Sequence, residues 1–128
     1  MARDNTGIKP TEAELTLLNI LWKLGPATVR QVHDTVSENQ KTGYTTVLKI
    51  LQIMHEKTLV IRDESNRAHV YAAANSEMFT QSSLLKDLVR KAFGGSTSKL
   101  VMRALDDSTS KEEIADIRQL LNELEQQD

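Results

Sequence analysis

The 128-residue chain contains no cysteine, only five aromatic residues and no apolar run of membrane-spanning length. Without cysteine it can form neither disulfides nor thiolate metal sites, and nothing points to an oxidising compartment. The first ten residues, MARDNTGIKP, lack the apolar segment of a secretion signal. No stretch approaches the roughly 18 to 20 apolar residues that a membrane helix needs. We therefore expect a cytoplasmic protein that is neither exported nor inserted in a membrane.

The composition, 39% apolar and 27% charged, is typical of a globular protein whose core consists mainly of Leu, Val and Ile. The length suits one domain, or one small domain with a helical module, and excludes a large enzyme scaffold. Residues 1–73 hold nine basic and eight acidic residues, a net charge of +1, whereas residues 74–128 hold seven and ten, a net charge of -3. This asymmetry allows a DNA-facing first half without proving one.

Capping boxes mark the start of two helices in the first part of the chain. In a capping box, a hydroxyl at the N-cap and a Glu or Gln three residues later each bond the other's backbone N–H. Residues Thr11 to Glu14 predict a helix that runs to about Leu24, where Gly25 and Pro26 end it. Residues Thr28 to Gln31 predict a second, short amphipathic helix.

A third helix is expected after Thr42, a reasonable N-cap. Its apolar residues recur with a helical period at Val47, Leu48, Leu51 and Met54, and Ile50 and Ile53 widen this stripe. Two β-prone segments, 59–62 and 69–72, then flank a polar turn and predict a two-stranded hairpin. Three helices followed by a hairpin are typical of a winged helix-turn-helix, in which the third helix (about 43–57) reads the DNA groove and the hairpin (about 59–72) is the wing.

The third helix opens with β-branched hydroxyl residues, which helices do not favour. Short hydroxyls at this place could meet base edges, thymine methyls and phosphates. The residues that we expect to contact DNA are Arg30, Thr42, Tyr44, Thr45, Thr46, Lys49, Gln52 and Arg67. In the competing interpretation the threonines and the lysine are ordinary solvated residues, and Tyr44 packs on the second helix and sets the approach of the third.

From Asn75 the pattern is helical throughout, with apolar rows over 82–93, a glycine break at Gly94 and Gly95, and helix starts at Ser96 and Ser110. A module of about 50 residues with three short amphipathic helices is marginal alone and normally needs oligomerisation. The predicted fold class is therefore mainly α: an α+β winged helix with a small hairpin wing (1–74) and a C-terminal three-helix dimerisation module (75–128). The residues expected in the dimer interface are Leu84, Leu85, Leu88, Phe93, Leu100, Val101, Leu105, Ile114, Ile117, Leu121 and Leu124.

Four short motifs, taken in their order along the chain, make this sequence resemble the penicillinase (beta-lactamase) repressors and the related methicillin-resistance and copper-responsive repressors. The motifs are 28–33 (TVRQVH), 44–48 (YTTVL), 67–71 (RAHVY) and 93–96 (FGGS). The resemblance covers nearly the whole chain and implies a homodimeric winged-helix repressor of palindromic operators, without a cofactor. It also implies, for members that control beta-lactam resistance, release by a membrane sensor-protease that triggers cleavage in the C-terminal module.

The chain departs from these relatives at several positions. Arg103-Ala104 stands where staphylococcal members have the Asn-Phe pair that is cleaved, and the cysteines of the copper-responsive branch are absent. Direct thiolate sensing of copper is therefore excluded. Ile53 replaces an Arg of many relatives, which removes a phosphate contact. Thr58 replaces the Gly that usually ends the third helix, which predicts strain there.

Other function classes have weaker support in the sequence. The three histidines, His33, His55 and His69, lack the i, i+4 spacing of helical metal ligands. Ser96 to Lys99 and Lys41 to Gly43 match the S-x-x-K and K-T-G patterns of serine beta-lactamases, but in the wrong order and in too short a chain. We therefore expect neither a metal site nor catalysis. The principal alternative is a winged-helix protein-protein interaction module that does not recognise a DNA sequence.

Overall fold

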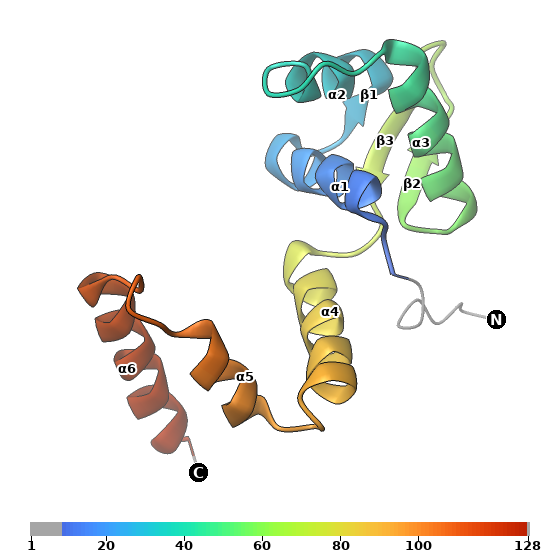
Figure 1. The fold of residues 1–128 in the computed structure, drawn as a ribbon. Helices are drawn as coiled ribbons and strands as arrows, with labels where there is room; N and C mark the ends of the chain where they lie inside the picture. Colours follow the sequence, from blue (N-terminus) through green and yellow to red (C-terminus); the bar gives the residue numbers. More distant parts are fainter. Residues whose placement is uncertain (1–8, 128) are drawn as a thin grey trace, which may run out of the picture. The chain divides into compact units, whose positions relative to one another are not determined.

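A computed structural model describes residues 9–127. The chain divides into two compact units, the first ending at Leu85 and the second beginning at Lys86, so that the division falls inside a helix. The elements, labelled in Figure 1, are α1 (Glu12–Leu24), β1 (Ala27–Thr28), α2 (Val29–Val36), α3 (Tyr44–Glu56), β2 (Val60–Asp63), β3 (Val70–Ala73), α4 (Glu77–Ala92), α5 (Thr97–Ala104) and α6 (Lys111–Glu125). No helix in the described range is long and apolar enough to cross a membrane.

The predicted capping boxes of the first two helices are confirmed. The Thr11 hydroxyl accepts the Glu14 N–H at 3.1 Å, and Thr28 accepts that of Gln31 at 3.2 Å, with the reciprocal side-chain bonds also present. Ser96 and Ser110 also cap their helices, each accepting the N–H three residues later. These bonds satisfy N–H groups that a helix start otherwise leaves without a partner. Four helix starts therefore follow directly from local sequence.

The prediction that Thr42 caps α3 is wrong, because the N-cap is Gly43. The Thr42 carbonyl instead accepts a hydrogen bond from Nε2 of His33 at 2.8 Å, which holds this residue in the turn before the helix. The apolar pattern also placed the start of α4 too late. Its first turn begins at Glu77, where the Ser76 hydroxyl accepts the Phe79 N–H at 3.0 Å.

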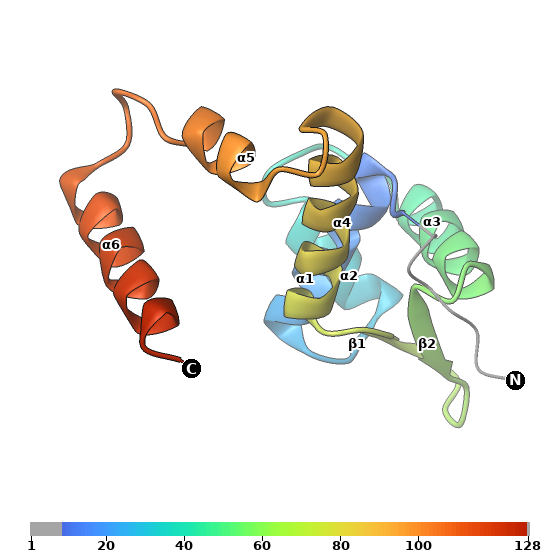
Figure 2. The ribbon, with the colours of Figure 1, turned by 90° about the horizontal axis from the view of Figure 1, so that it is seen from below.

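The predicted hairpin is present, but it belongs to a three-stranded antiparallel sheet with the order β1-β3-β2. Strand β1, which the sequence pattern does not predict, pairs Ala27 with Tyr71 and Thr28 with Val70. Two residues are too short to show the alternation that identifies a strand. In Figure 2 the connection between β2 and β3 extends beyond the strand ends as the wing.

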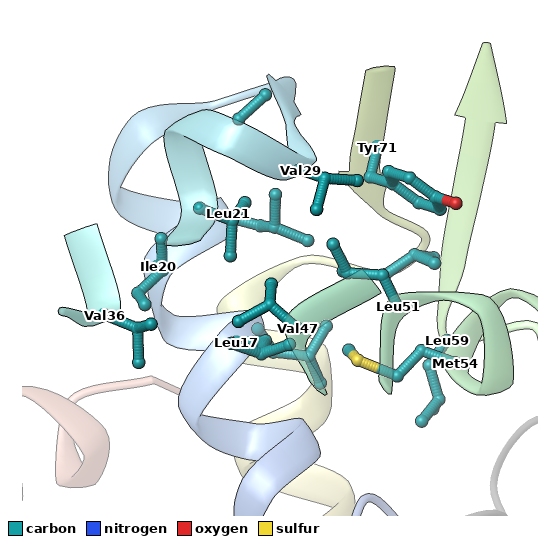
Figure 3. Packing of buried hydrophobic residues seen from close by; sticks show 14 residues of the cluster. Leu17, Ile20, Leu21, Val29, Val36, Val47, Leu51, Met54, Leu59 and Tyr71 are labelled. Atoms are coloured by element: carbon teal, nitrogen blue, oxygen red, sulfur yellow. The ribbon is translucent and has the colours of Figure 1, made fainter. Parts of the chain in front are cut away.

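The core of the first unit lies between α1, α2, α3 and one face of the sheet (Figure 3). Its aliphatic residues come from all three helices, and Tyr71 of β3 closes the sheet side at 1% exposure. The buried apolar cluster consists of Leu17, Leu18, Ile20, Leu21, Ala27, Val29, Val32, Val36, Val47, Leu51, Met54, Leu59, Val60 and Tyr71. Trp22 lies at the margin of this cluster and donates from Nε1 to the Asn75 carbonyl at 3.0 Å. This core fixes the position of α3.

A partly buried ion pair joins the start of α1 to the end of α3. Glu14 is only 3% exposed, and Nζ of Lys57 lies 2.9 Å and 3.1 Å from its two carboxylate oxygens. Burial acts to raise the pKa of Glu14, but hydrogen bonds from Lys57 and Thr11 outweigh it, and the net pKa lies below the usual value. The same carboxylate therefore caps α1 and anchors α3.

The strain predicted where α3 ends is present at Thr58, which has a φ of +63°. The Leu59 N–H bonds the Met54 carbonyl at 2.9 Å, and the Thr58 N–H bonds that of His55 at 3.1 Å. These two bonds define a Schellman motif, whose left-handed position normally holds glycine. A β-branched residue there loses roughly 1–2 kcal/mol relative to an unstrained conformation.

Thr58→Gly should therefore stabilise the first unit by about 1 kcal/mol, since relief of strain exceeds the greater flexibility of glycine in the unfolded chain. Thermal unfolding followed by circular dichroism should show the midpoint rising by roughly 4 °C. Thr58→Ala is the matched control, because it removes the branched side chain but retains the positive φ. A glycine variant that unfolds below the wild type would contradict this account.

Candidate nucleic-acid interface

One side of α3 is sealed in the core and the other is open. Val47, Leu51 and Met54 are each 0% exposed and face the core. The exposed residues lie on the opposite side of the helix, consistent with its period of 3.6 residues. Apart from Tyr44 at the start of the helix, these exposed residues form what we call the outer face of α3: Thr45, Thr46, Lys49, Gln52, Ile53 and Glu56.

The chemistry of the outer face changes along the helix. Hydroxyls occupy the first turn, Lys49 and Gln52 follow, and the acid Glu56 comes last. A hydroxyl, an ammonium and an amide can all bond base edges or phosphates, whereas a carboxylate repels phosphate. The part of α3 suited to DNA is therefore its first three turns.

Tyr44 packs against α2, as the competing interpretation held, although 42% of it stays exposed. Its ring meets that of His33 edge to face at a centroid distance of 5.9 Å, and Cζ of Arg30 lies 5.7 Å from its centroid. Such contacts contribute roughly 0.5–1.5 kcal/mol each. Tyr44 and Arg30 thus set the angle between α2 and α3 while remaining at the surface.

His33 is a positioning residue that the sequence analysis did not single out for this role. Its hydrogen bond to the Thr42 carbonyl and its contact with Tyr44 fix the turn between α2 and α3. In the sequence, His33 was noted only as the last residue of the motif at 28–33. Spacing alone could not reveal it, because a bond across nine residues depends on the path of the turn.

The N-terminus of α3 has no side-chain cap. Gly43 is extended there, with φ -75° and ψ 151°, and it offers no side-chain oxygen to the first turn. Backbone N–H groups at such a helix start carry partial positive charge and suit an anion such as phosphate. This arrangement differs from α1, α2, α5 and α6, where a Thr or Ser side chain fills that place.

The wing contains four charged side chains, Arg62, Asp63, Glu64 and Arg67. Arg67 is exposed near its tip. Arg62 is held by Glu64, with nitrogen-oxygen distances of 2.7 Å, and this bond lowers the pKa of Glu64 below its usual value. Asp63 accepts the Ser65 N–H at 2.9 Å, and its hydrogen bonds with Ser65 lower its pKa as well. Arg62, the nearest cation to the turn on β2, is therefore occupied within the wing.

Glu64→Gln should remove the ion pair with Arg62 while leaving its hydrogen bond with Tyr71, so that the unpaired positive charge attracts phosphate and raises DNA affinity on the order of fivefold for each copy of the chain in the complex. The dependence of affinity on salt should steepen at the same time, which fluorescence anisotropy at several salt concentrations would measure. Glu12→Gln, which removes one exposed carboxylate from the first turn of α1, is the control for net charge. Equal gains from both variants would show that Arg62 is not the cause.

Other kinds of site find little support. Within residues 9–127 no three His, Cys, Asp or Glu side chains are placed to hold a metal ion.

The predicted DNA-contact residues lie on α3, in the turn before it, at the start of α2 and on the wing, all in the first unit. Thr42 is half-buried in the turn before α3, and the other seven are exposed.

Three helices, a small sheet with a projecting hairpin and an exposed third helix define a winged-helix DNA-binding regulator. Residues 10–123 match the family model described as penicillinase repressor. The chain belongs to the penicillinase repressor family, and it is a DNA-binding transcriptional repressor and not an enzyme. The mainly helical winged-helix fold and the family predicted from the sequence are confirmed.

Individual relatives agree with this assignment. The chain is 30% identical over 115 residues to the transcriptional regulator BlaI of Mycobacterium tuberculosis, covering 89% of this chain and 83% of that one. It is 21% identical over 120 residues to the methicillin resistance regulatory protein MecI of Staphylococcus aureus, covering 93% and 98%. A MarR family protein from Bacillus stearothermophilus shares the fold, with a TM-score of 0.53 and 20% identity over 94% of this chain and 76% of the other.

Proposed function

We propose that the chain acts as a homodimer on a palindromic operator, with α3 of each copy in a major groove and the wing on the adjacent backbone. The observation that carries this proposal is the outer face of α3, which presents Thr45, Thr46, Lys49 and Gln52 to solvent on a helix whose other side is fixed in the core. Arg30, Tyr44, Arg67 and the Thr42 turn complete the proposed contact surface. Such a repressor acts where the genome lies, which supports the expected cytoplasmic location.

The proposed dimer rests on the C-terminal helices. None of α4, α5 and α6 contains a fully buried residue, although each carries an apolar stripe. Leu88, Leu121 and Leu124 are about half exposed in the single chain. Apolar side chains left this open normally mark an interface. We propose that residues from 75 onward form the dimerisation module, through the leucine, isoleucine, valine and phenylalanine side chains that the sequence analysis named.

A twofold dimer matches a palindromic site because it presents two identical helices to two half-sites about one helical turn apart. This expectation separates the proposal from the alternative of a protein-interaction module. Family membership already favours the DNA reader. A dimer requires two half-sites with twofold symmetry at a fixed spacing, whereas a monomer requires only one half-site.

The proposal is tested by selecting DNA from a random library with the full chain and measuring the mass of the bound complex by light scattering. We expect an enriched sequence with twofold symmetry and a complex of two chains per duplex. Thr46→Val should relax the preference at one position of each half-site more than it weakens nonspecific binding. Enrichment of a single, asymmetric half-site by a monomer would contradict the dimer.

Release from DNA by a membrane sensor-protease is the partner interaction that the family suggests. Arg103 and Ala104, which replace the Asn-Phe pair, are both exposed on α5. An enzyme that requires Asn-Phe is not expected to cut here. We therefore propose a sensor-protease partner that cleaves a peptide bond other than Asn-Phe. Incubating the chain with the candidate protease and identifying the products by mass spectrometry would test this proposal.

A further inference from the structure

Ile53 is the one apolar side chain among the six residues of the outer face. It is 36% exposed and follows Thr46 and Lys49 at the i, i+3, i+7 spacing of a single row along α3. Residues seven apart on a helix are separated by two turns and face nearly the same direction. The row therefore places a hydroxyl, an ammonium and a branched hydrocarbon side by side.

The core does not account for this isoleucine. Val47, Leu51 and Met54 complete the buried side of α3 at 0% exposure. Leu48 and Ile50 are partly buried and pack against the core cluster, whereas Ile53 does not belong to either group. Just over a third of Ile53 is therefore accessible on the outer face.

In the major groove, the apolar group that a protein can contact is the C5-methyl of thymine, while the other base edges offer hydrogen-bond donors and acceptors. An isoleucine gains little from phosphate or from a guanine edge, because it can neither donate nor accept. The neighbouring Lys49 makes the same surface attractive to a polyanion, which favours DNA over an apolar protein partner.

We propose that Ile53 contacts the methyl group of a thymine and so determines the base at one position of each half-site. This inference rests on the proposed function. Seven residues at 1.5 Å each span roughly 10 Å, or about three base steps of 3.4 Å. The thymine read by Ile53 thus lies about three base pairs from the position read by Thr46.

The test uses the duplex selected by the wild-type chain, in which each thymine is replaced in turn by deoxyuridine, which lacks only the methyl group. At one thymine per half-site, the loss of the methyl should weaken wild-type binding roughly fourfold. Ile53→Ala should abolish that difference at that thymine alone. Thr46→Ser, which removes the methyl of the other candidate reader, should leave the difference in place.

The possible results distinguish a failure of the Ile53 assignment from a failure of the proposed function. If the wild type selects a symmetric sequence but Ile53→Ala keeps every deoxyuridine effect, the Ile53 assignment is overturned and the repressor proposal stands. If the wild type selects no sequence, both fail. A large fall in the thermal midpoint of Ile53→Ala, with its deoxyuridine profile unchanged, would assign the side chain to packing and overturn the inference.

Discussion

Raising the salt concentration from 50 to 200 mM is expected to weaken operator binding by roughly a thousandfold. The proposed dimer brings three cations per copy to the phosphates, from Arg30, Lys49 and Arg67. Each neutralised phosphate releases a counterion, and six contacts give a slope of about -5 in a plot of log affinity against log salt. Fluorescence anisotropy with a labelled operator duplex measures this slope directly.

Lys49→Ala should flatten the same slope by about two units, because a dimer loses the contact twice. A monomer on a half-site would lose about one unit, so the variant also reports the number of copies bound. Lys23→Ala, which removes an exposed lysine from the last turn of α1, is the matched control and should change the slope little. Binding that is insensitive to salt, or equal slopes for Lys49→Ala and the wild type, would remove the electrostatic basis of the proposed interface.

Local signals in the sequence were sufficient for the helices, for the hairpin of β2 and β3, and for the order of these elements. Each of the capping boxes at Thr11 and Thr28 lies within four consecutive residues, so it can be recognised from the residue types alone. Likewise, the period of Val47, Leu51 and Met54 identified the buried side of α3, although Ile53, which was expected to widen the apolar stripe, is 36% exposed. These predictions succeeded because each depends on neighbours in the chain.

Features that depend on distant residues were not predictable in this way. Strand β1 forms because Ala27 and Thr28 pair with the edge of β3. Two residues are too few to show the alternation of apolar and polar residues that identifies a strand. His33 reaches the Thr42 carbonyl across a turn whose path the sequence does not specify, and the N-cap of α3 is Gly43 and not Thr42. The Glu14 to Lys57 ion pair, 43 residues apart, is of the same kind. The missed details of the site are therefore those created by tertiary packing.

The two sides of α3 can be separated experimentally with adjacent residues. Leu51→Ala should destabilise the first unit by about 3–4 kcal/mol, because it removes a fully buried side chain and leaves a cavity between α3 and the rest of the core. A small domain has only about 5–15 kcal/mol of stability in total. Operator binding should then fall in proportion to the population that unfolds, with the largest loss near the lowered thermal midpoint.

Gln52→Ala, one residue further along, is the matched control because it truncates an exposed side chain on the same turn. Its stability should lie within about 0.5 kcal/mol of the wild type. Its sequence preference should nevertheless change at one position of each half-site, which a competition assay with point-substituted operators would detect. Urea unfolding and operator binding, measured on both variants, therefore assign each residue to one side of the helix. Comparable destabilisation by the two variants would mean that α3 is not held as a rod with one sealed and one open side, and the proposed interface would lose its structural basis.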